Sequence, residues 1–191
     1  MTGATEGRPL MTVDLDGVVC APLFGVNLGI HRELLDPEAP APAARVWPRW
    51  IGDPLDHLRF DLRRPVEGAA EALGRLAAVR ELVLLTGRRS SPAGWLRRHG
   101  LDGYFSGIVI NEGGWKSPHY KLEQVGRLGA TEHVDDDGRT AQLLAQRSGA
   151  TVYLRDWPRN RDLALDAGVI RVADLGELAA LVERGEGSPA P

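Results

Sequence analysis

The sequence predicts an α/β fold in three layers, in which helices cover both faces of a parallel β-sheet. Three observations lead to this prediction. Short apolar runs alternate with helical segments along most of the chain, a pattern typical of parallel strands joined by crossover helices. Of the 191 residues 43% are hydrophobic, which suffices for one compact core. A proline-rich stretch after the first apolar run breaks the alternation and indicates a small insertion.

The first half of the pattern predicts three strands and two helices. Residues 69–78 are amphipathic, so they should pack one helical face on the sheet. In the next helical segment Ser91 supplies an N-cap, Pro92 suits the first turn and Gly100 ends the helix. The expected elements are strands Leu10–Val13, Glu81–Leu85 and Ile108–Ile110, and helices Ala69–Ala78 and Ser91–His99.

The second half repeats the alternation and closes with a helix. Its apolar runs predict strands at Glu132–Val134, Thr151–Leu154 and Val169–Val172. The segments between and after these runs predict helices at Tyr120–Leu128, Thr140–Ser148 and Leu175–Arg184.

One core domain is expected, formed by residues 10–19 and 65–184, with a small insertion at 20–64. A long irregular insert in a compact domain is usually functional or disordered, and the tryptophans Trp47 and Trp50 favour an ordered one. Residues 1–9 and 185–191 are small, polar and bear Gly and Pro, so we expect flexible tails.

Composition argues against several classes of function. The formal charge is −3, with 23 basic and 26 acidic residues, which argues against nucleic acid as the main partner but allows a small anionic substrate. Cys20 is the only cysteine, so no intramolecular disulfide forms and a reducing cytoplasm is expected. We find no secretory signal and no apolar stretch approaching the roughly 20 residues that cross a bilayer.

Two carboxylates follow the first strand, in the run Val13-Asp14-Leu15-Asp16-Gly17. Parallel sheets place their ligands at the carboxyl ends of strands, and Gly17 helps the chain to turn there. Paired carboxylates suit metal binding, or a division of labour between a nucleophile and a general acid. An ordinary Asp-Gly turn is the alternative interpretation.

A second acidic cluster, Asp135-Asp136-Asp137-Gly138, follows the predicted strand at Glu132–Val134. Three adjacent acids repel one another and need a cation or free solvent. An exposed turn is the alternative. A calcium loop of the EF-hand type is excluded, because alignment on Gly138 puts His133 and Leu144 at the end ligand positions.

The second strand leads into Thr86-Gly87-Arg88, where a hydroxyl and a close backbone approach would suit a phosphate oxygen. An ordinary strand-to-helix turn is the alternative. Two lysines, Lys116 and Lys121, precede the acidic cluster. His133 is expected only to pack within its strand.

The order of these motifs along the chain is more specific than any single motif. Asp-x-Asp, then Thr, then Lys, then an acidic pair resembles the four motifs of the haloacid dehalogenase superfamily, over about Leu10–Val172. Receiver domains use similar residues in another order and do not match. The resemblance implies a Rossmann-like core, with a small cap inserted after the first strand.

The resemblance also implies roles for the acidic residues. Asp14 would be the nucleophile and Asp16 the general acid and base. Mg²⁺ would lie between the Asp14 carboxylate, the Asp16 backbone carbonyl and an acid of the last motif. We assign that acid to Asp136 with Asp135 in support, while Asp137 leaves the register open by one residue.

Around the phosphoryl group, the resemblance implies that Thr86 donates a hydrogen bond and that a lysine stabilises charge. Lys121 matches that lysine better than Lys116. Gly87 and Arg88 are further candidates for substrate binding.

The insertion occupies the position of a cap that selects substrate. Its candidate contacts are Trp47 and Arg49, followed by Trp50, His57 and Arg59, although the tryptophans would equally serve to pack the cap on the core.

Together these matches predict a Mg²⁺-dependent phosphomonoester hydrolase with an aspartyl-phosphate intermediate. Its substrate would be a small phosphorylated metabolite or nucleotide. Residues 86–100 are similar to polynucleotide 3′-phosphatases and lipin-type phosphatases, and residues 153–160 to 5′-deoxyribonucleotidase-like members, so the substrate stays open. Transfer to an acceptor other than water, as in mutases, and a silent phospho-ligand-binding module are the alternatives. A homodimer is left open.

Overall fold

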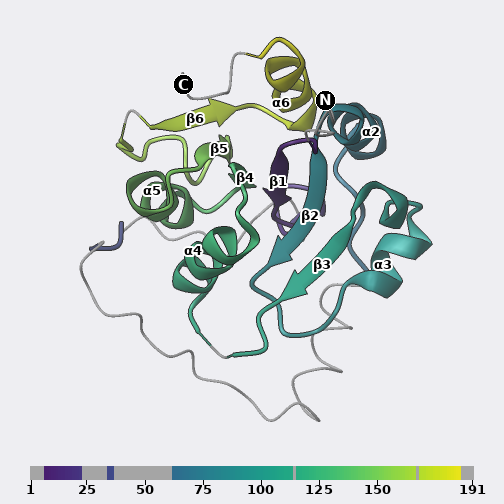
Figure 1. Ribbon diagram of the computed structural model, residues 1–191, viewed down its shortest axis with the longest axis horizontal. Helices are drawn as coiled ribbons and strands as arrows, with labels where there is room; N and C mark the ends of the chain where they lie inside the picture. The colour runs from purple at the N-terminus through teal and green to yellow at the C-terminus, as the bar shows by residue number, and fades with distance from the viewer. Residues whose placement is uncertain (1–6, 23–33, 37–61, 114, 167, 186–191) are drawn as a thin grey trace, which may run out of the picture.

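The computed structural model describes residues 7–22, 34–36, 62–113, 115–166 and 168–185 (Figure 1). Most of the predicted insertion lies outside these ranges. The candidate contacts Trp47, Arg49, Trp50, His57 and Arg59 therefore belong to the part of the chain that is not described.

The described residues form one six-stranded sheet in which every strand pairs in parallel with its neighbours, in the order β3-β2-β1-β4-β5-β6. The first strand along the chain, β1, lies between β2 and β4, so the loops that follow these three strands meet at one edge of the sheet. The strands are β1 Leu10–Val13, β2 Glu81–Thr86, β3 Gly107–Ile110, β4 Glu132–Asp135, β5 Thr151–Arg155 and β6 Val169–Val172.

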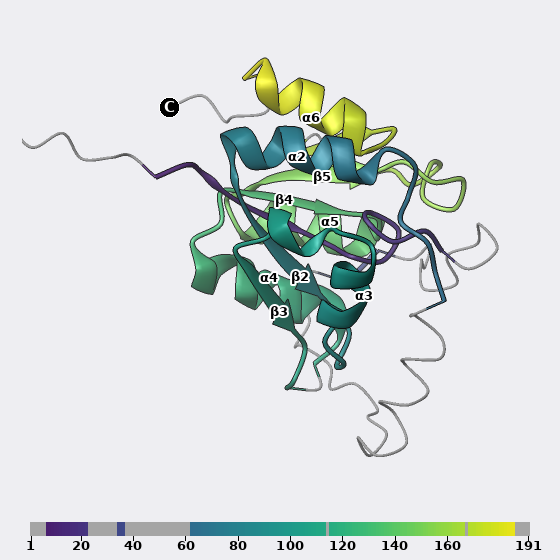
Figure 2. The same ribbon diagram turned by 90° about the vertical axis from the view of Figure 1, so that its right-hand side faces the viewer.

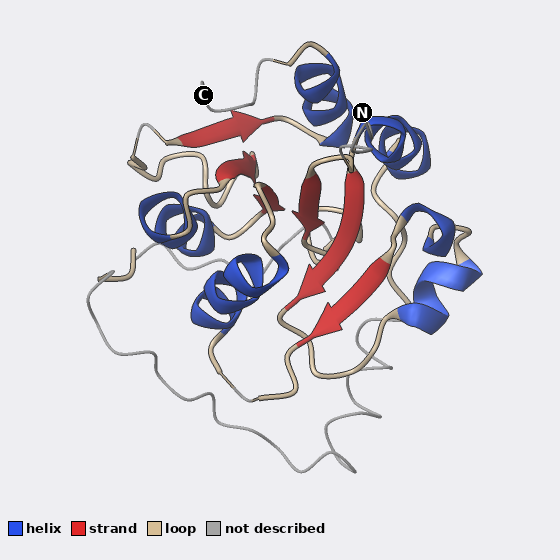
Figure 3. Cartoon of the chain, in the orientation of Figure 1, coloured by secondary structure: helices blue, strands red, loops and turns tan. Residues whose placement is uncertain are grey.

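Helices cover both faces of this sheet, which gives the three layers visible in Figures 2 and 3. Side chains such as Leu84 and Val134 pack toward α2, α3 and α6, whereas Leu85 and Leu154 pack toward α4 and α5. The alternation follows from the period of two residues in a strand. The helices are α2 Ala69–Val79, α3 Ala93–Arg98, α4 Ser117–Leu128, α5 Gly138–Arg147 and α6 Leu175–Glu183, with a 3-10 turn at Asp102–Tyr104.

The predicted three-layer α/β class with a parallel sheet is confirmed. Boundaries differ at α4, which begins at Ser117 instead of Tyr120. Pro118 lies in its first turn, where the missing N–H would have had no helical partner. Among the described residues, no helix is both long and apolar enough to span a membrane.

The chain leaves the core beside the point where it returns. Cys20 forms an antiparallel bridge with Pro65, the N–H of Ala21 donates to the carbonyl of Arg64 at 2.9 Å, and that of Val66 donates to Val19 at 2.9 Å. Residues after the first strand and residues before α2 are thereby joined next to the carboxyl end of β1.

Candidate functional site

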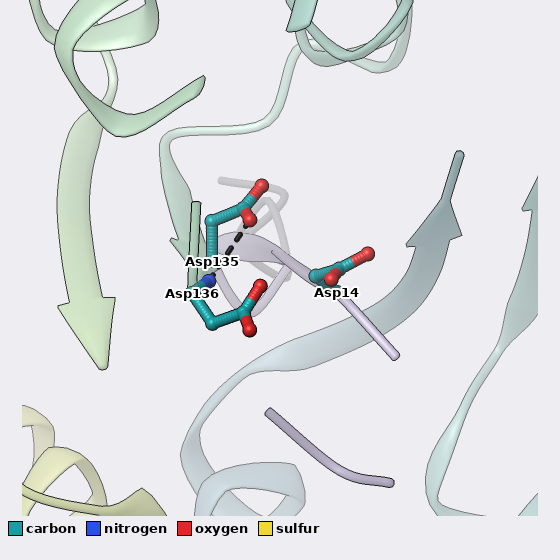
Figure 4. A group of neighbouring side chains, drawn as sticks. All are labelled: Asp14, Asp135 and Asp136. Carbon is teal, nitrogen blue, oxygen red and sulfur yellow. Dashed lines mark hydrogen bonds between the residues drawn. The ribbon is translucent and has the colours of Figure 1, made fainter. Parts of the chain in front are cut away.

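Three carboxylates from two neighbouring strands converge at this edge (Figure 4). Asp14 follows β1, and Asp135 and Asp136 lie at the end of β4 and directly after it. Each offers one oxygen, and these three oxygens lie within 4.8 Å of one another. The structure therefore brings the two acidic motifs of the sequence into one site, as the order of motifs predicted.

Gly17 makes this close approach of the two loops feasible. Its φ is +78°, a left-handed conformation that glycine adopts without strain. A Cβ at this position would lie 1.8 Å from Oδ2 of Asp136. Its carbonyl accepts hydrogen bonds from Arg155 Nη1 at 2.7 Å and from the Trp157 indole at 3.0 Å. The last residue of β5 and the segment that follows it therefore hold the turn in place.

We expect Gly17→Ala to destabilise the fold by about 1–2 kcal/mol through φ alone, and further through the collision with Asp136. Gly100→Ala is the matched control, because Gly100 has φ +66° but no atom within 4 Å of the place that a Cβ would occupy. Urea unfolding measures both. Equal losses for the two variants would contradict the proposed contact.

Lys121 supplies the positive charge of this cluster. Its side chain is 4% exposed, and Nζ lies 2.7 Å from Oδ1 of Asp14 and 2.8 Å from Oδ2 of Asp135. Burial alone would lower the pKa of Lys121, but the two carboxylates raise it above its usual value, so the amine stays protonated. The other candidate, Lys116, is exposed and precedes α4. The structure places Lys121, and not Lys116, beside the carboxylates.

All four lone-pair positions of the Asp135 carboxylate are occupied. Oδ1 accepts the N–H groups of Asp136 at 2.9 Å and Asp137 at 3.0 Å, and Oδ2 accepts Lys121 and, at 3.0 Å, His133 Nε2. Burial would raise the pKa of Asp135, yet Lys121 and His133 lower it below its usual range. Asp135 therefore positions Lys121. Because its lone pairs already accept hydrogen bonds, its short distance from Asp14 and Asp136 does not by itself make it a metal ligand.

His133 does more than pack within its strand. Its side chain is fully buried, and burial lowers its pKa, so the ring is neutral. Because Asp135 can only accept, Nε2 carries the proton, and Nδ1 accepts the Thr12 hydroxyl at 2.8 Å. A buried line of hydrogen bonds thus runs from Thr12 through His133 and Asp135 to Lys121. The sequence showed no sign of it beyond one histidine two residues before an acid.

Asp14 and Asp136 are the two carboxylates that suit a divalent cation. Burial raises the pKa of Asp14 to about 7, Lys121 opposes this, and Asp135 adds to it. Burial and the charge of Asp14 raise the pKa of Asp136 well above its usual value. The three carboxylates cluster beside the ammonium of Lys121, and hard oxygen donors of this kind fit Mg²⁺. Asp137 instead caps α5, accepting the N–H of Arg139 at 3.2 Å.

These pKa shifts predict how Mg²⁺ stabilises the protein as the pH changes. The folded-state pKa of Asp14, about 7, lies above its unfolded value of 3.8, so its contribution is complete below about pH 4 and is lost as the pH rises through 7. Asp136 is shifted in the same direction. We therefore expect metal-free protein to lose stability from about pH 5 to pH 8, and the melting-temperature gain from Mg²⁺ to grow over that range. A gain from Mg²⁺ independent of pH would contradict this.

Asp16 is held by two arginines. Arg88 approaches side-on, with Nε 2.7 Å from Oδ2 and Nη2 2.5 Å from Oδ1, and Nη1 of Arg63 lies 2.7 Å from Oδ1. In this arrangement the carboxyl group is the counter-ion of two guanidinium groups. The sequence analysis named Arg88 as a candidate substrate contact. It did not identify Arg63, because no recognisable motif surrounds that residue.

Thr86 and Gly87 occupy the end of β2, beside β1. The Thr86 hydroxyl is fully buried and accepts the N–H of Arg88 at 3.3 Å, so its own proton is available to another acceptor. A Cβ on Gly87 would lie 2.4 Å from the hydroxyl of Ser117, so glycine permits α4 to begin there. The short distance between Gly87 and Ser117 brings the start of α4, the helix that carries Lys121, close to the site.

Asn160 is a further residue that supports the site. It is fully buried, and its amide donates to the carbonyls of Asp136 and Arg155, both at 2.8 Å. Its side-chain oxygen accepts the N–H of Trp157 at 2.8 Å. The sequence analysis gave Asn160 no role, beyond the similarity of residues 153–160 to 5′-deoxyribonucleotidase-like members.

The chain matches no protein-family model and no curated protein. Its fold is similar to several solved structures. A haloacid dehalogenase-like family hydrolase from Xanthomonas campestris matches over 93% of this chain and 96% of its own, at 17% identity and a TM-score of 0.57. The D,D-heptose 1,7-bisphosphate phosphatase from B. bronchiseptica, complexed with magnesium and phosphate, matches over 93% of this chain and 99% of its own, at 17% identity and a TM-score of 0.56.

A HAD-superfamily hydrolase of subfamily IA from Geobacter sulfurreducens matches over 92% of this chain and all of its own, at 22% identity and a TM-score of 0.57. At such identities these likenesses establish the fold. The chain therefore has the Rossmann-like α/β fold of the haloacid dehalogenase superfamily, and the similar structures include a phosphatase, dehalogenases and a putative mutase.

Proposed function

We propose that this protein is a Mg²⁺-dependent phosphomonoester hydrolase that acts through an aspartyl-phosphate on Asp14. The observation that carries the proposal is the convergence of Asp14, Asp136 and Lys121 in one buried cluster. A carboxylate nucleophile beside a second carboxylate and an ammonium suits attack on a phosphate dianion, provided that a cation offsets the negative charge.

In the first step an oxygen of Asp14 attacks phosphorus, and the bond between phosphorus and the ester oxygen breaks. Asp16, once it has left the two guanidinium groups and taken up a proton from solvent, gives that proton to the departing oxygen, so the alcohol leaves neutral. Lys121, already 2.7 Å from Asp14, stabilises the negative charge on the phosphoryl oxygens. Thr86 directs its hydroxyl proton to the same group.

In the second step Asp16 accepts a proton from water as the water attacks phosphorus. The bond from phosphorus to Asp14 breaks, which releases inorganic phosphate and restores the Asp14 carboxylate. A Mg²⁺ ion held by Asp14 and Asp136, with the Asp16 backbone carbonyl as the sequence resemblance implies, would neutralise charge on the carboxylates and the phosphoryl oxygens. Asp135 and His133 keep Lys121 in place throughout.

The presence of an acid at position 16 favours phosphate esters over carbon–halogen substrates, because leaving alkoxides need a proton and leaving halides do not. Transfer to an acceptor other than water is an alternative fate of the same intermediate. An added alcohol acceptor would then compete with phosphate release.

The test is release of phosphate from p-nitrophenyl phosphate and a panel of metabolite phosphates, with Mg²⁺ and after its removal by EDTA. We expect turnover only with Mg²⁺. Undiminished activity in EDTA would refute the metal requirement, and no turnover of any ester would refute the proposed reaction.

A further inference from the structure

A short segment that begins at the end of β5 contacts both turns that carry the acidic residues of the site. The turns are residues 14–17 and 135–137, and the segment is residues 155–160, which we call the clamp segment. It holds the Gly17 carbonyl of the first turn through two donors and the Asp136 carbonyl of the second turn through one. These three hydrogen bonds therefore fall on the backbone of the two turns, and none of them involves a carboxylate.

Asn160 is the centre of the clamp segment, because every polar atom of its side chain has a partner. Its Nδ2 donates to the carbonyls of Asp136 and Arg155, both at 2.8 Å, and its Oδ1 accepts the N–H of Trp157 at 2.8 Å. The side chain is fully buried, and Nη2 of Arg171 in β6 donates to the Asn160 carbonyl at 3.0 Å. The fold thus fixes Asn160, and Asn160 in turn fixes the Asp136 carbonyl.

Arg155 and Trp157 hold the first turn in a similar way. Nη1 of Arg155 donates to the carbonyls of Gly17 and Val18 at 2.7 and 3.3 Å. The Trp157 indole donates to the same Gly17 carbonyl at 3.0 Å. The two side chains also contact each other, with the guanidinium carbon 4.3 Å from the centre of the indole ring. A stacked cation and ring therefore share one acceptor, which restricts movement of the Gly17 peptide.

The two turns are so close together that a small relative shift would move a candidate metal ligand. A Cβ on Gly17 would lie 1.8 Å from Oδ2 of Asp136, so this carboxylate lies against the Gly17 backbone. One oxygen of Asp14 and one of Asp136 lie within 4.8 Å of each other (Figure 4). Burial, and then the charge of Asp14, raise the pKa of Asp136, because the two carboxylates repel each other when both are ionised. Hydrogen bonds that hold the turns together oppose this repulsion.

A fixed spacing of the ligands matters most for a small cation. Mg²⁺ demands nearly octahedral geometry with oxygens about 2.0–2.1 Å away, whereas Ca²⁺ accepts about 2.3–2.6 Å and a flexible geometry. Ligands whose spacing can increase still suit Ca²⁺. They suit Mg²⁺ less well, because the ion must draw them together against their repulsion.

We propose that Asn160, with Arg155 and Trp157, sets the spacing of the two acidic turns and thereby makes the site selective for Mg²⁺ over Ca²⁺. The three are positioning residues, which act through the backbone carbonyls of Gly17 and Asp136. This inference rests on the proposed function, because it concerns the cation that the proposed reaction requires.

Calorimetric titration of metal-free protein with MgCl₂ and with CaCl₂ tests the proposal. In Asn160→Ala we expect the Kd of Mg²⁺ to rise by about 10–100-fold, the usual effect of removing a group that orients a metal ligand. The Kd of Ca²⁺ should rise less, so the preference for Mg²⁺ shrinks. Trp157→Phe keeps the ring but removes the N–H that Gly17 accepts, and it should shift both constants in the same directions by smaller factors. Trp157→Phe decides the matter if melting temperatures show that Asn160→Ala does not fold.

Gln142→Ala is the matched control, because Gln142 is another buried amide that holds a loop. Its side chain donates to the Asp166 carboxylate and accepts the Asp166 N–H at 2.9 Å, and neither residue belongs to the carboxylate cluster. This variant should melt at a lower temperature than wild type and keep both dissociation constants. The same pattern in Asn160→Ala would mean a purely structural role and would overturn the proposal, as would an equal rise of both constants.

Metal binding distinguishes a failure of this inference from a failure of the proposed function. Weaker and less selective binding by Asn160→Ala supports the inference even if wild type hydrolyses no ester. Unchanged binding by the folded variants overturns the inference even if wild type hydrolyses esters with Mg²⁺. A wild type that binds no Mg²⁺ overturns both the inference and the metal requirement.

Discussion

Replacing Asp14 by Asn is expected to lower kcat for p-nitrophenyl phosphate by on the order of 10⁴ or more, because the amide cannot form the acyl phosphate. The same change should stabilise the metal-free protein near pH 8. Burial raises the pKa of Asp14 to about 7, so its ionised form is costly there, and a neutral side chain avoids that cost. Mg²⁺ should stabilise the variant less than it stabilises wild type.

Loss of activity together with a gain in stability distinguishes an effect on chemistry from an effect on folding, because a variant that is inactive through misfolding would melt at a lower temperature. Asp137→Asn is the matched control within the other acidic motif. Asp137 caps α5, so this variant should retain most activity and lose at most about 1 kcal/mol of unfolding free energy. Residual turnover of Asp14→Asn above a tenth of wild type would rule out Asp14 as the nucleophile.

Replacing Lys121 by Met is expected to remove activity and to destabilise the fold by about 3–5 kcal/mol near pH 8. The ammonium pairs with Asp14 and Asp135, which are both buried, and its loss leaves their charges uncompensated. The loss should shrink near pH 5, where Asp14, with a pKa of about 7, becomes protonated. Urea unfolding at both pH values measures it.

Lys116→Met provides the comparison, because Lys116 is an exposed lysine immediately before the same helix. Its effect on unfolding should stay within about 0.5 kcal/mol, and activity should persist. If both lysine variants were equally stable and equally active, the buried ion pairs would not have the importance that we assign to them.

The strands and helices could be predicted almost completely from the sequence. Apolar alternation located every strand in the part of the chain that the structure describes, and errors were confined to the ends of elements, for example where polar residues continue the ladder. Thr86 pairs with Ile110 and Asp135 with Leu154, so both strands extend beyond their last apolar residue. Backbone pairing depends on the neighbouring strand, which local composition does not contain.

The candidate site was predictable only as a set of residue types. Asp14, Lys121 and Asp136 were selected because their order resembles a known set of motifs. Arg63 and His133 carry no such pattern, since an arginine before a helix and a histidine within a strand are ordinary features. Their partners become visible only when segments far apart in sequence are brought together.

What the sequence determined by itself was the alternation of strands and helices and the residues available at each strand end, because these depend on local periodicity and turn chemistry. The tertiary structure decided which of those residues meet. Placing β1 between β2 and β4 brings Asp16 to Arg88, 72 positions away, and Lys121 to Asp14. The physical reason is that charge pairing and burial are properties of distance in space, and only the order of strands in the sheet sets that distance.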